Sequence, residues 1–136
     1  MIYLDSAAVV KLVRQEANSN DLVARLNAQP GIPLVSSALV EVVVPGALRR
    51  AAPQALVGVP TAVGRLFRLE IVPTIRAKAA AFAEPTLRTV DAIHLATAQV
   101  LTNELGAPVT AFVTYDQRLL ASASAAGLPT ASPGWP

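Results

Sequence analysis

The chain has 136 residues, of which 53% are hydrophobic and 15% are charged, with a net charge of +2. This size and composition predict a single folded domain over residues 1–136 and exclude a disordered chain. The absence of cysteine excludes a disulfide framework, a thiolate zinc site and a cysteine nucleophile. Nine of the eleven basic residues are arginines, which suit a phosphate-bearing partner, although a solvated surface explains them equally well.

The first third of the chain reads as two strands that alternate with two helices. An apolar run at the N-terminus is followed by Ser6, a favourable helix cap. The pair Pro30-Gly31 ends the second helical pattern. The predicted elements are a strand at 1–4, a helix from 6 to about 16, a helix from 18–21 to about 29, and a strand at 33–36.

The sequence of segment 37–50 allows two secondary-structure predictions. Its end, Ala47-Leu-Arg-Arg50, is typical of a helix, whereas Val42-Val-Val-Pro-Gly46 is β-branched and then broken. Proline inside a helix costs about 3 kcal/mol and glycine about 1 kcal/mol. We favour a kinked helix, and a strand that ends at Val44 is the alternative.

The rest of the chain continues the alternation of helices and strands. Gly106 ends the longest helical pattern, and a short proline-rich tail follows the last helix. The predicted elements are a helix at 53–66, a strand at 69–72, helices at 74–83 and at about 90–105, a strand at 110–114 and a helix at 117–126. This order indicates an α/β fold with a parallel sheet, right-handed crossovers and helices on both faces.

The chain carries no sequence signal for a membrane. No uninterrupted apolar stretch reaches the roughly 18 residues of a spanning helix. No basic region precedes the first apolar run, as it would in a signal peptide. We therefore expect a cytoplasmic protein.

Three of the four aspartates occupy positions that suit metal ligands. Asp5 follows the first predicted strand, Asp116 follows the last one, and Asp91 lies near the start of the longest helix. Ligands of open α/β sheets bind outside the carboxyl ends of the strands. Carboxylate oxygens suit Mg²⁺ and Mn²⁺. We therefore expect the three carboxylates to converge, and their repulsion to raise at least one pKa.

Each of these residues also has a simpler explanation when taken alone. Asp5 is a good helix cap, Asp91 complements the positive end of its helix dipole, and Asp116 suits a turn after a strand. His94, the only histidine, lies one helical turn from Asp91. A general base or ligand is one reading of His94, and a packed structural residue is the reading that we favour.

Three segments, together and in this order, resemble a PIN domain, and more narrowly the VapC toxins of bacterial and archaeal toxin–antitoxin pairs. The resemblance covers nearly the whole chain, and the middle segment is the most specific. It implies a three-layer PIN-like fold with a central parallel sheet of four to five strands flanked by helices. The segments are Met1-Ile-Tyr-Leu-Asp-Ser-Ala-Ala8, Asp91-Ala-Ile-His-Leu-Ala-Thr-Ala98 and Phe112-Val-Thr-Tyr-Asp116.

The resemblance also implies an activity and its partners. Proteins of this type are Mg²⁺- or Mn²⁺-dependent endoribonucleases that cut transfer or ribosomal RNA, are blocked by a VapB antitoxin, and commonly form homodimers. By this resemblance Asp5, Asp91 and Asp116 are the catalytic acids, with Asp5 and Asp91 as metal ligands and Asp116 acting through water. Ser6 and Thr114 lie beside them in the sequence as supporting polar groups.

The chain departs from the family pattern in one place. The family usually has a glutamate on the helix after the second strand and an arginine one turn later, and these positions are Val43 and Gly46 here. Glu41 lies two residues before Val43, about 200° around a regular helix, so we expect it to point away from Asp5 and Asp91 unless Pro45 shifts the register. We expect Val43 beside Asp5.

Three functions compete on this evidence. The first is a toxin ribonuclease weakened at position 43, and the second is an impaired PIN module that acts by binding the antitoxin. The third, a receiver or small phosphatase, is disfavoured because the middle strand offers no aspartate and no lysine follows Thr114. Arg49 and Arg50 are expected to contact RNA or antitoxin, unless they are a solvated helix face. The surplus of apolar surface predicts a homodimer.

Overall fold

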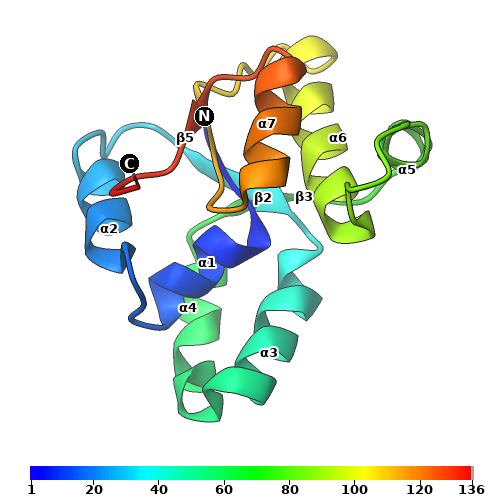
Figure 1. Ribbon diagram of the computed structural model, residues 1–136. Helices are drawn as coiled ribbons and strands as arrows, with labels where there is room; N and C mark the ends of the chain where they lie inside the picture. The colour runs from blue at the N-terminus through cyan, green and yellow to red at the C-terminus, as the bar shows by residue number, and fades with distance from the viewer. Residues whose placement is uncertain (136) are drawn as a thin grey trace.

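The computed structural model describes residues 1–135 and has a five-stranded sheet at its centre, with strand order β3-β2-β1-β4-β5 (Figure 1). Every neighbouring pair of strands is parallel. The strands are β1 (Ile2–Leu4), β2 (Leu34–Ser37), β3 (Phe67–Leu69), β4 (Ala111–Val113) and β5 (Thr130–Ala131). The predicted parallel α/β fold with four to five strands is therefore confirmed.

Helices cover both faces of this sheet (Figure 1). Residues from the first four α-helices pack on one face, and residues from α6 and α7 pack on the other, with α5 against α6. None of the helices in residues 1–135 is long and apolar enough to cross a membrane. They are α1 (Ser6–Val13), α2 (Ser19–Asn27), α3 (Val40–Ala51), the 3-10 helix η1 (Pro53–Gly58), α4 (Val59–Gly64), α5 (Pro73–Ala80), α6 (Thr89–Asn103) and α7 (Gln117–Ala125).

The central strand β1 is buried on both faces. Ile2 and Leu4 pack into the cluster under α1 to α4, whereas Tyr3 packs into the cluster under α6 and α7. This alternation follows from the period of two along a strand. Because β1 lies between β2 and β4, the residue that follows it is delivered to the middle of the carboxyl edge of the sheet. That residue is Asp5.

At the edges of the sheet, the predicted bounds of one strand were wrong and another strand was not assigned. The third strand is Phe67–Leu69 and not residues 69–72, because its pairing with β2 sets the register and pairs Val35 with Phe67. Ile71 instead packs beside α5 and α6. The second miss is β5, which lies in the tail that we had read as irregular and pairs with β4. Edge strands are short and mixed in polarity, so their own sequence marks them poorly.

The first helix ends at Val13 and not near Glu16, as the sequence had suggested. The buried Ser19 stops it, because its hydroxyl accepts from the Glu16 amide at 2.9 Å and donates to the Lys11 carbonyl at 2.9 Å. Asn18 has a left-handed backbone, with a φ of 68°. The resulting tight turn holds Glu16 beside α1.

Proline has a different effect in each of two segments that were predicted to be helical. The segment predicted as one helix at 53–66 divides into η1 and α4, with Pro60 in the first turn of α4, where a missing amide proton is harmless. In contrast, α3 runs continuously through Pro45. The strand alternative for this segment was wrong. The carbonyl that Pro45 leaves without a donor belongs to Glu41, which is exposed to water.

Replacing Pro45 with alanine should stabilise the fold. The new amide supplies the missing hydrogen bond of α3, and the gain is reduced by the extra freedom of the unfolded chain, so we expect about 1–2 kcal/mol. Urea unfolding measures the change. Pro60→Ala is the matched control and should show no gain, because its proline lies in a first turn. Equal effects of both substitutions would contradict this account of α3.

Candidate active site

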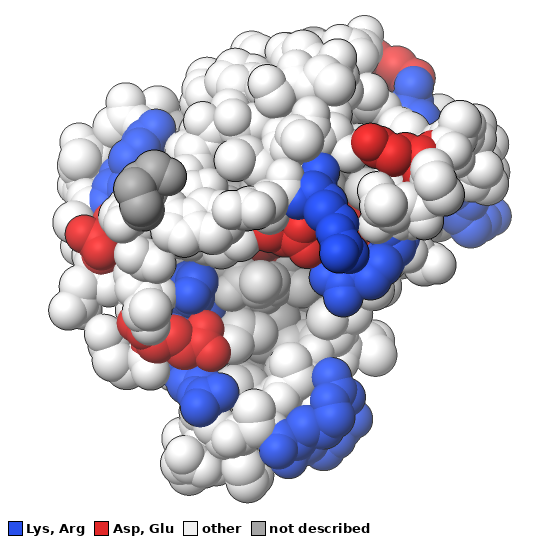
Figure 2. All heavy atoms as spheres, viewed as in Figure 1, with Lys and Arg blue, Asp and Glu red and all other residues white. Residues whose placement is uncertain are grey.

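The three aspartates line one pocket of about 770 Å³ at the carboxyl edge of the sheet. Asp5 follows β1, Asp116 lies beyond the end of β4, and Asp91 is in the first turn of α6. Figure 2 shows acidic atoms inside this hollow, partly behind basic side chains, with further basic groups on its rims. Elements far apart in sequence therefore bring these acids to one place.

Asp5 is the most buried of the three acids, with 4% of its surface exposed. Its Oδ1 accepts from the Ala8 amide at 2.8 Å and so caps α1. Burial raises the pKa of Asp5 to about 6, the charges of Asp91 and Asp116 add to this, and the Thr114 hydroxyl opposes it. The expected rise in pKa is confirmed, but burial rather than repulsion is its largest cause.

Arg88 bridges the other two acids, and the sequence analysis missed it. Its Nε donates to Asp91 Oδ2 at 3.3 Å, and its Nη2 donates to Asp116 Oδ2 at 3.2 Å. The only signal in the sequence was the spacing of Arg88 and Asp91, which puts them one helical turn apart. The link to Asp116 depends on the packing of α6 beside α7.

Asp116 has a structural task as well as its place in the pocket. Its Oδ1 accepts from the amides of Arg118 at 2.8 Å and Leu119 at 3.2 Å, which caps α7. The Thr114 hydroxyl in turn accepts from the Asp116 amide at 3.1 Å. One carboxylate oxygen therefore fixes the residue, and the other faces Arg88.

His94 is a buried structural residue, as the favoured reading predicted. The Ser6 amide donates to Nε2 at 3.1 Å, so this nitrogen carries no proton, and the Ser6 hydroxyl donates to it at 2.7 Å. Nδ1 therefore carries the proton and donates to the Tyr3 hydroxyl at 2.8 Å. Burial lowers the pKa of His94 to about 3. The imidazole is neutral and holds Ser6 at the pocket wall.

The structure separates the two candidate positions on α3. Val43 lines the pocket together with Asp5 and Asp91. Glu41 is exposed and pairs with Arg68 at 3.3 Å, so it contributes nothing to this pocket. The wall that faces the aspartates from α3 is therefore apolar.

Arg49 and Arg50 are exposed on the last turn of α3. A Cβ placed on Gly46 would lie 3.7 Å from an Arg49 guanidinium nitrogen and 3.8 Å from one of Arg50. Both side chains therefore fold back over Gly46, the position of the family's arginine. Positive charge is present there although the usual residue is absent.

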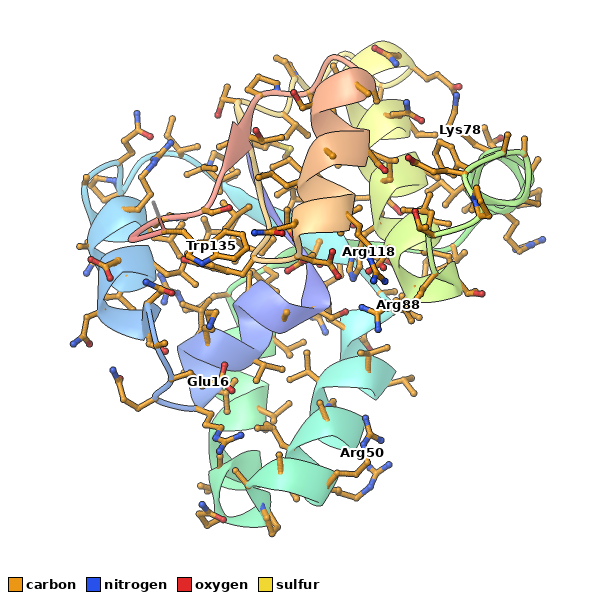
Figure 3. All side chains as sticks on the ribbon, viewed as in Figure 1. Glu16, Arg50, Lys78, Arg88, Arg118 and Trp135 are labelled. Carbon is orange, nitrogen blue, oxygen red and sulfur yellow. The ribbon has the colours of Figure 1, made fainter. Side chains whose placement is uncertain are left out.

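A fourth acid, Glu16, also lines the pocket and was not among the predicted site residues. It pairs with Lys11 at 3.7 Å and with Arg14 at 3.6 Å. Figure 3 shows it at the far end of α1 from Arg88. Two cations therefore compensate its charge, and it lies at the opposite end of α1 from the Arg88 contacts (Figure 3).

The aspartates fit a hard divalent ion in chemistry but do not form a closed cage. Oxygen donors suit Mg²⁺ or Mn²⁺, and the raised pKa of the buried Asp5 marks negative charge that a cation would stabilise. No group of three or more His, Cys, Asp or Glu side chains in residues 1–135 is placed to hold an ion directly. Asp5, Asp91 and Asp116 nevertheless line the same pocket.

Comparisons with known proteins place this fold and pocket in a family. The PIN domain model matches residues 2–124. The chain is 46% identical to Ribonuclease VapC35 of Mycobacterium tuberculosis (strain ATCC 25618 / H37Rv) over 134 residues, covering 98% of each chain. It is 37% identical to Ribonuclease VapC47 of M. tuberculosis (strain CDC 1551 / Oshkosh) over 143 residues, again covering 98% of each. The chain therefore belongs to the PIN domain family and, within it, to the VapC type.

The charge on Asp5 should destabilise the metal-free protein at neutral pH. Its folded pKa of about 6 exceeds the ordinary 3.8, so the folded state binds this proton more tightly and stability falls as pH rises through that range. Asp5→Asn keeps the Oδ1 acceptor and removes the charge, so it should raise the unfolding free energy at pH 7.5 by about 2–3 kcal/mol.

Urea unfolding in EDTA at pH 7.5 and pH 4 measures this effect, which should nearly vanish at the lower pH. Glu70→Gln removes an exposed carboxylate and serves as the control. A gain for Asp5→Asn that is the same at both pH values would contradict a buried titrating carboxyl.

Proposed function

We propose that the protein is a divalent-metal-dependent endoribonuclease, the toxin of a type II toxin–antitoxin pair. The observation that carries this proposal is the convergence of Asp5, Asp91 and Asp116 in one pocket. The relatives named ribonuclease support the choice of substrate. Transfer or ribosomal RNA is the proposed target, and a VapB-type antitoxin is the proposed partner.

The chain's own residues provide the surroundings for hydrolysis of a phosphodiester. A Mg²⁺ or Mn²⁺ ion held by Asp5 and Asp91 would supply positive charge for the phosphoryl oxygens and activate a water molecule. Asp116 fixes the mouth of the pocket through the α7 cap. Ser6 presents its hydroxyl at the wall, and the neutral His94 keeps it there.

Turnover by this chain is proposed to be weak because Val43 offers no oxygen ligand. The valine lies in the pocket wall where the family usually has a glutamate. The alternative function is an impaired PIN module that acts by occupying its antitoxin. Position 43 favours this alternative, whereas the three aspartates favour the nuclease.

Restoring an acid at position 43 should separate these two functions. We expect Val43→Glu to tighten Mn²⁺ binding and to raise RNA cleavage at least tenfold, equivalent to about 1.4 kcal/mol in the barrier. Calorimetry measures the metal affinity, and a labelled RNA incubated with Mn²⁺ measures cleavage. The unchanged chain should cleave slowly, and its complete inactivity would support the antitoxin-binding module.

Two further substitutions on α3 control for charge and register. Ala51→Glu adds the same charge on an exposed position of α3 outside the pocket and should change neither measurement. Glu41→Ala should also leave both unchanged, because Glu41 pairs with Arg68 outside the pocket. If Glu41→Ala abolishes cleavage while Val43→Glu has no effect, Glu41 is the second acid.

The protein is also proposed to form a homodimer through exposed apolar groups. Val42 on α3 is 73% exposed, Val57 on η1 is 87% exposed, and Phe67 on β3 is 62% exposed. Such groups favour burial in an interface. Sedimentation at micromolar concentration should show a dimer that Val42→Ser and Val57→Ser weaken. A clean monomer for the unchanged chain would end this proposal.

A further inference from the structure

In the ion pairs of Arg88, the arginine is much more exposed to solvent than the two aspartates. The arginine side chain is 72% exposed, whereas the side chains of Asp91 and Asp116 are 14% and 28% exposed. One solvated cation therefore balances two more sheltered carboxylates, beside the buried Asp5. Ion pairs with an exposed partner are individually weak, so this arginine is held loosely.

The arginine can leave without any change in the backbone. Arg88 is the N-cap residue of α6, its carbonyl accepts from the Ala92 amide at 2.8 Å, and its side chain makes no capping bond. The preceding loop is attached to α7 by the Ser122 hydroxyl, which donates to Glu84 at 2.5 Å. Only side-chain rotation separates the bridged state from a state in which the guanidinium points elsewhere.

The charges of the pocket decide when that rotation is favourable. Removing Arg88 alone leaves two carboxylates uncompensated beside Asp5, which is unfavourable in a sheltered site. A divalent cation bound to the acids replaces this charge and competes for the same oxygens. The freed guanidinium is then available for an anion, and its planar fork suits a phosphate. Arg118 lies in the first turn of α7, where its amide donates to Asp116, so it adds positive charge near the carboxylate that Arg88 also contacts.

We propose that Arg88 is an exchangeable counter-ion: it pairs with Asp91 and Asp116 and offsets part of their charge in the metal-free protein, and it transfers to a phosphate of RNA when a divalent ion takes the carboxylates. The phosphate part rests on the ribonuclease function proposed above. The exchange makes metal and RNA bind with positive coupling, and linkage requires the coupling to be reciprocal. Arg88 is then both a competitor of the metal and a ligand of the substrate.

The first test measures Mn²⁺ binding by electron paramagnetic resonance without RNA. Arg88→Gln should bind Mn²⁺ about threefold to tenfold more tightly, as the loss of two weak ion pairs implies. Arg118→Gln is the matched control: it removes a charge two residues from Asp116, and Arg118 forms no salt bridge within the described part of the chain. Its effect should stay below about twofold. Arg88→Lys keeps the charge without the planar fork, so its Mn²⁺ affinity should fall between those of the unchanged chain and Arg88→Gln.

The second test measures binding of a short single-stranded 2′-O-methyl oligoribonucleotide by fluorescence anisotropy, in EDTA and in Mn²⁺. Mn²⁺ should strengthen binding by the unchanged chain, and Arg88→Gln should lose most of this gain while Arg118→Gln keeps it. Equal Mn²⁺ affinities of the unchanged chain and Arg88→Gln would overturn the proposal. Equal tightening by both glutamine variants would also overturn it, because only long-range charge would then act.

The results of these tests can reject the counter-ion exchange and the ribonuclease function independently of each other. Tighter Mn²⁺ binding by Arg88→Gln together with no RNA cleavage by any variant supports the competition with metal and rejects the nuclease. Cleavage by the unchanged chain with no response of Mn²⁺ affinity to Arg88 supports the nuclease and rejects the exchange. Retention of the full Mn²⁺-dependent gain in oligonucleotide binding by Arg88→Gln rejects the transfer to phosphate.

Discussion

A buried carboxylate at the end of the central strand is the constraint around which the rest of the site is arranged. Asp5 follows β1, whose three residues are fully buried, and its side chain also caps α1. Burial raises its pKa to about 6, so the fold keeps there a group that is unfavourable in the charged form. The Ala8 amide and the Thr114 hydroxyl offset part of this, and a cation in the pocket would offset more.

The surroundings of Asp5 follow from this constraint. The layer behind it is a neutral network in which His94 joins Tyr3 of the sheet to Ser6 of α1. In residues 1–135 every fully buried side-chain nitrogen and oxygen has a hydrogen-bond partner. Arg88, whose side chain is mostly exposed, bridges Asp91 and Asp116. Part of the charge of these two acids is thus compensated from the solvent side, where the proposed exchange would take place.

Helix α3 has one face in the pocket and another face exposed to solvent. Glu41 and Val43 are two residues apart, and they face opposite sides of the helix: the first pairs with Arg68, and the second lines the pocket. Pro45 leaves the helix continuous, so it does not return Glu41 to the site. On α3 it is therefore position 43, and not position 41, that faces the pocket.

The sequence by itself determined the alternation of strands and helices and the places of the three aspartates, because apolar runs and capping residues are local signals. It also predicted the direction of Glu41, which follows from helical geometry alone. Only the tertiary structure decided the register of β3, the pairing of β5, and the reach of Arg88 from α6 to Asp116. These features depend on elements that are distant in sequence and meet through packing. No local pattern specifies them.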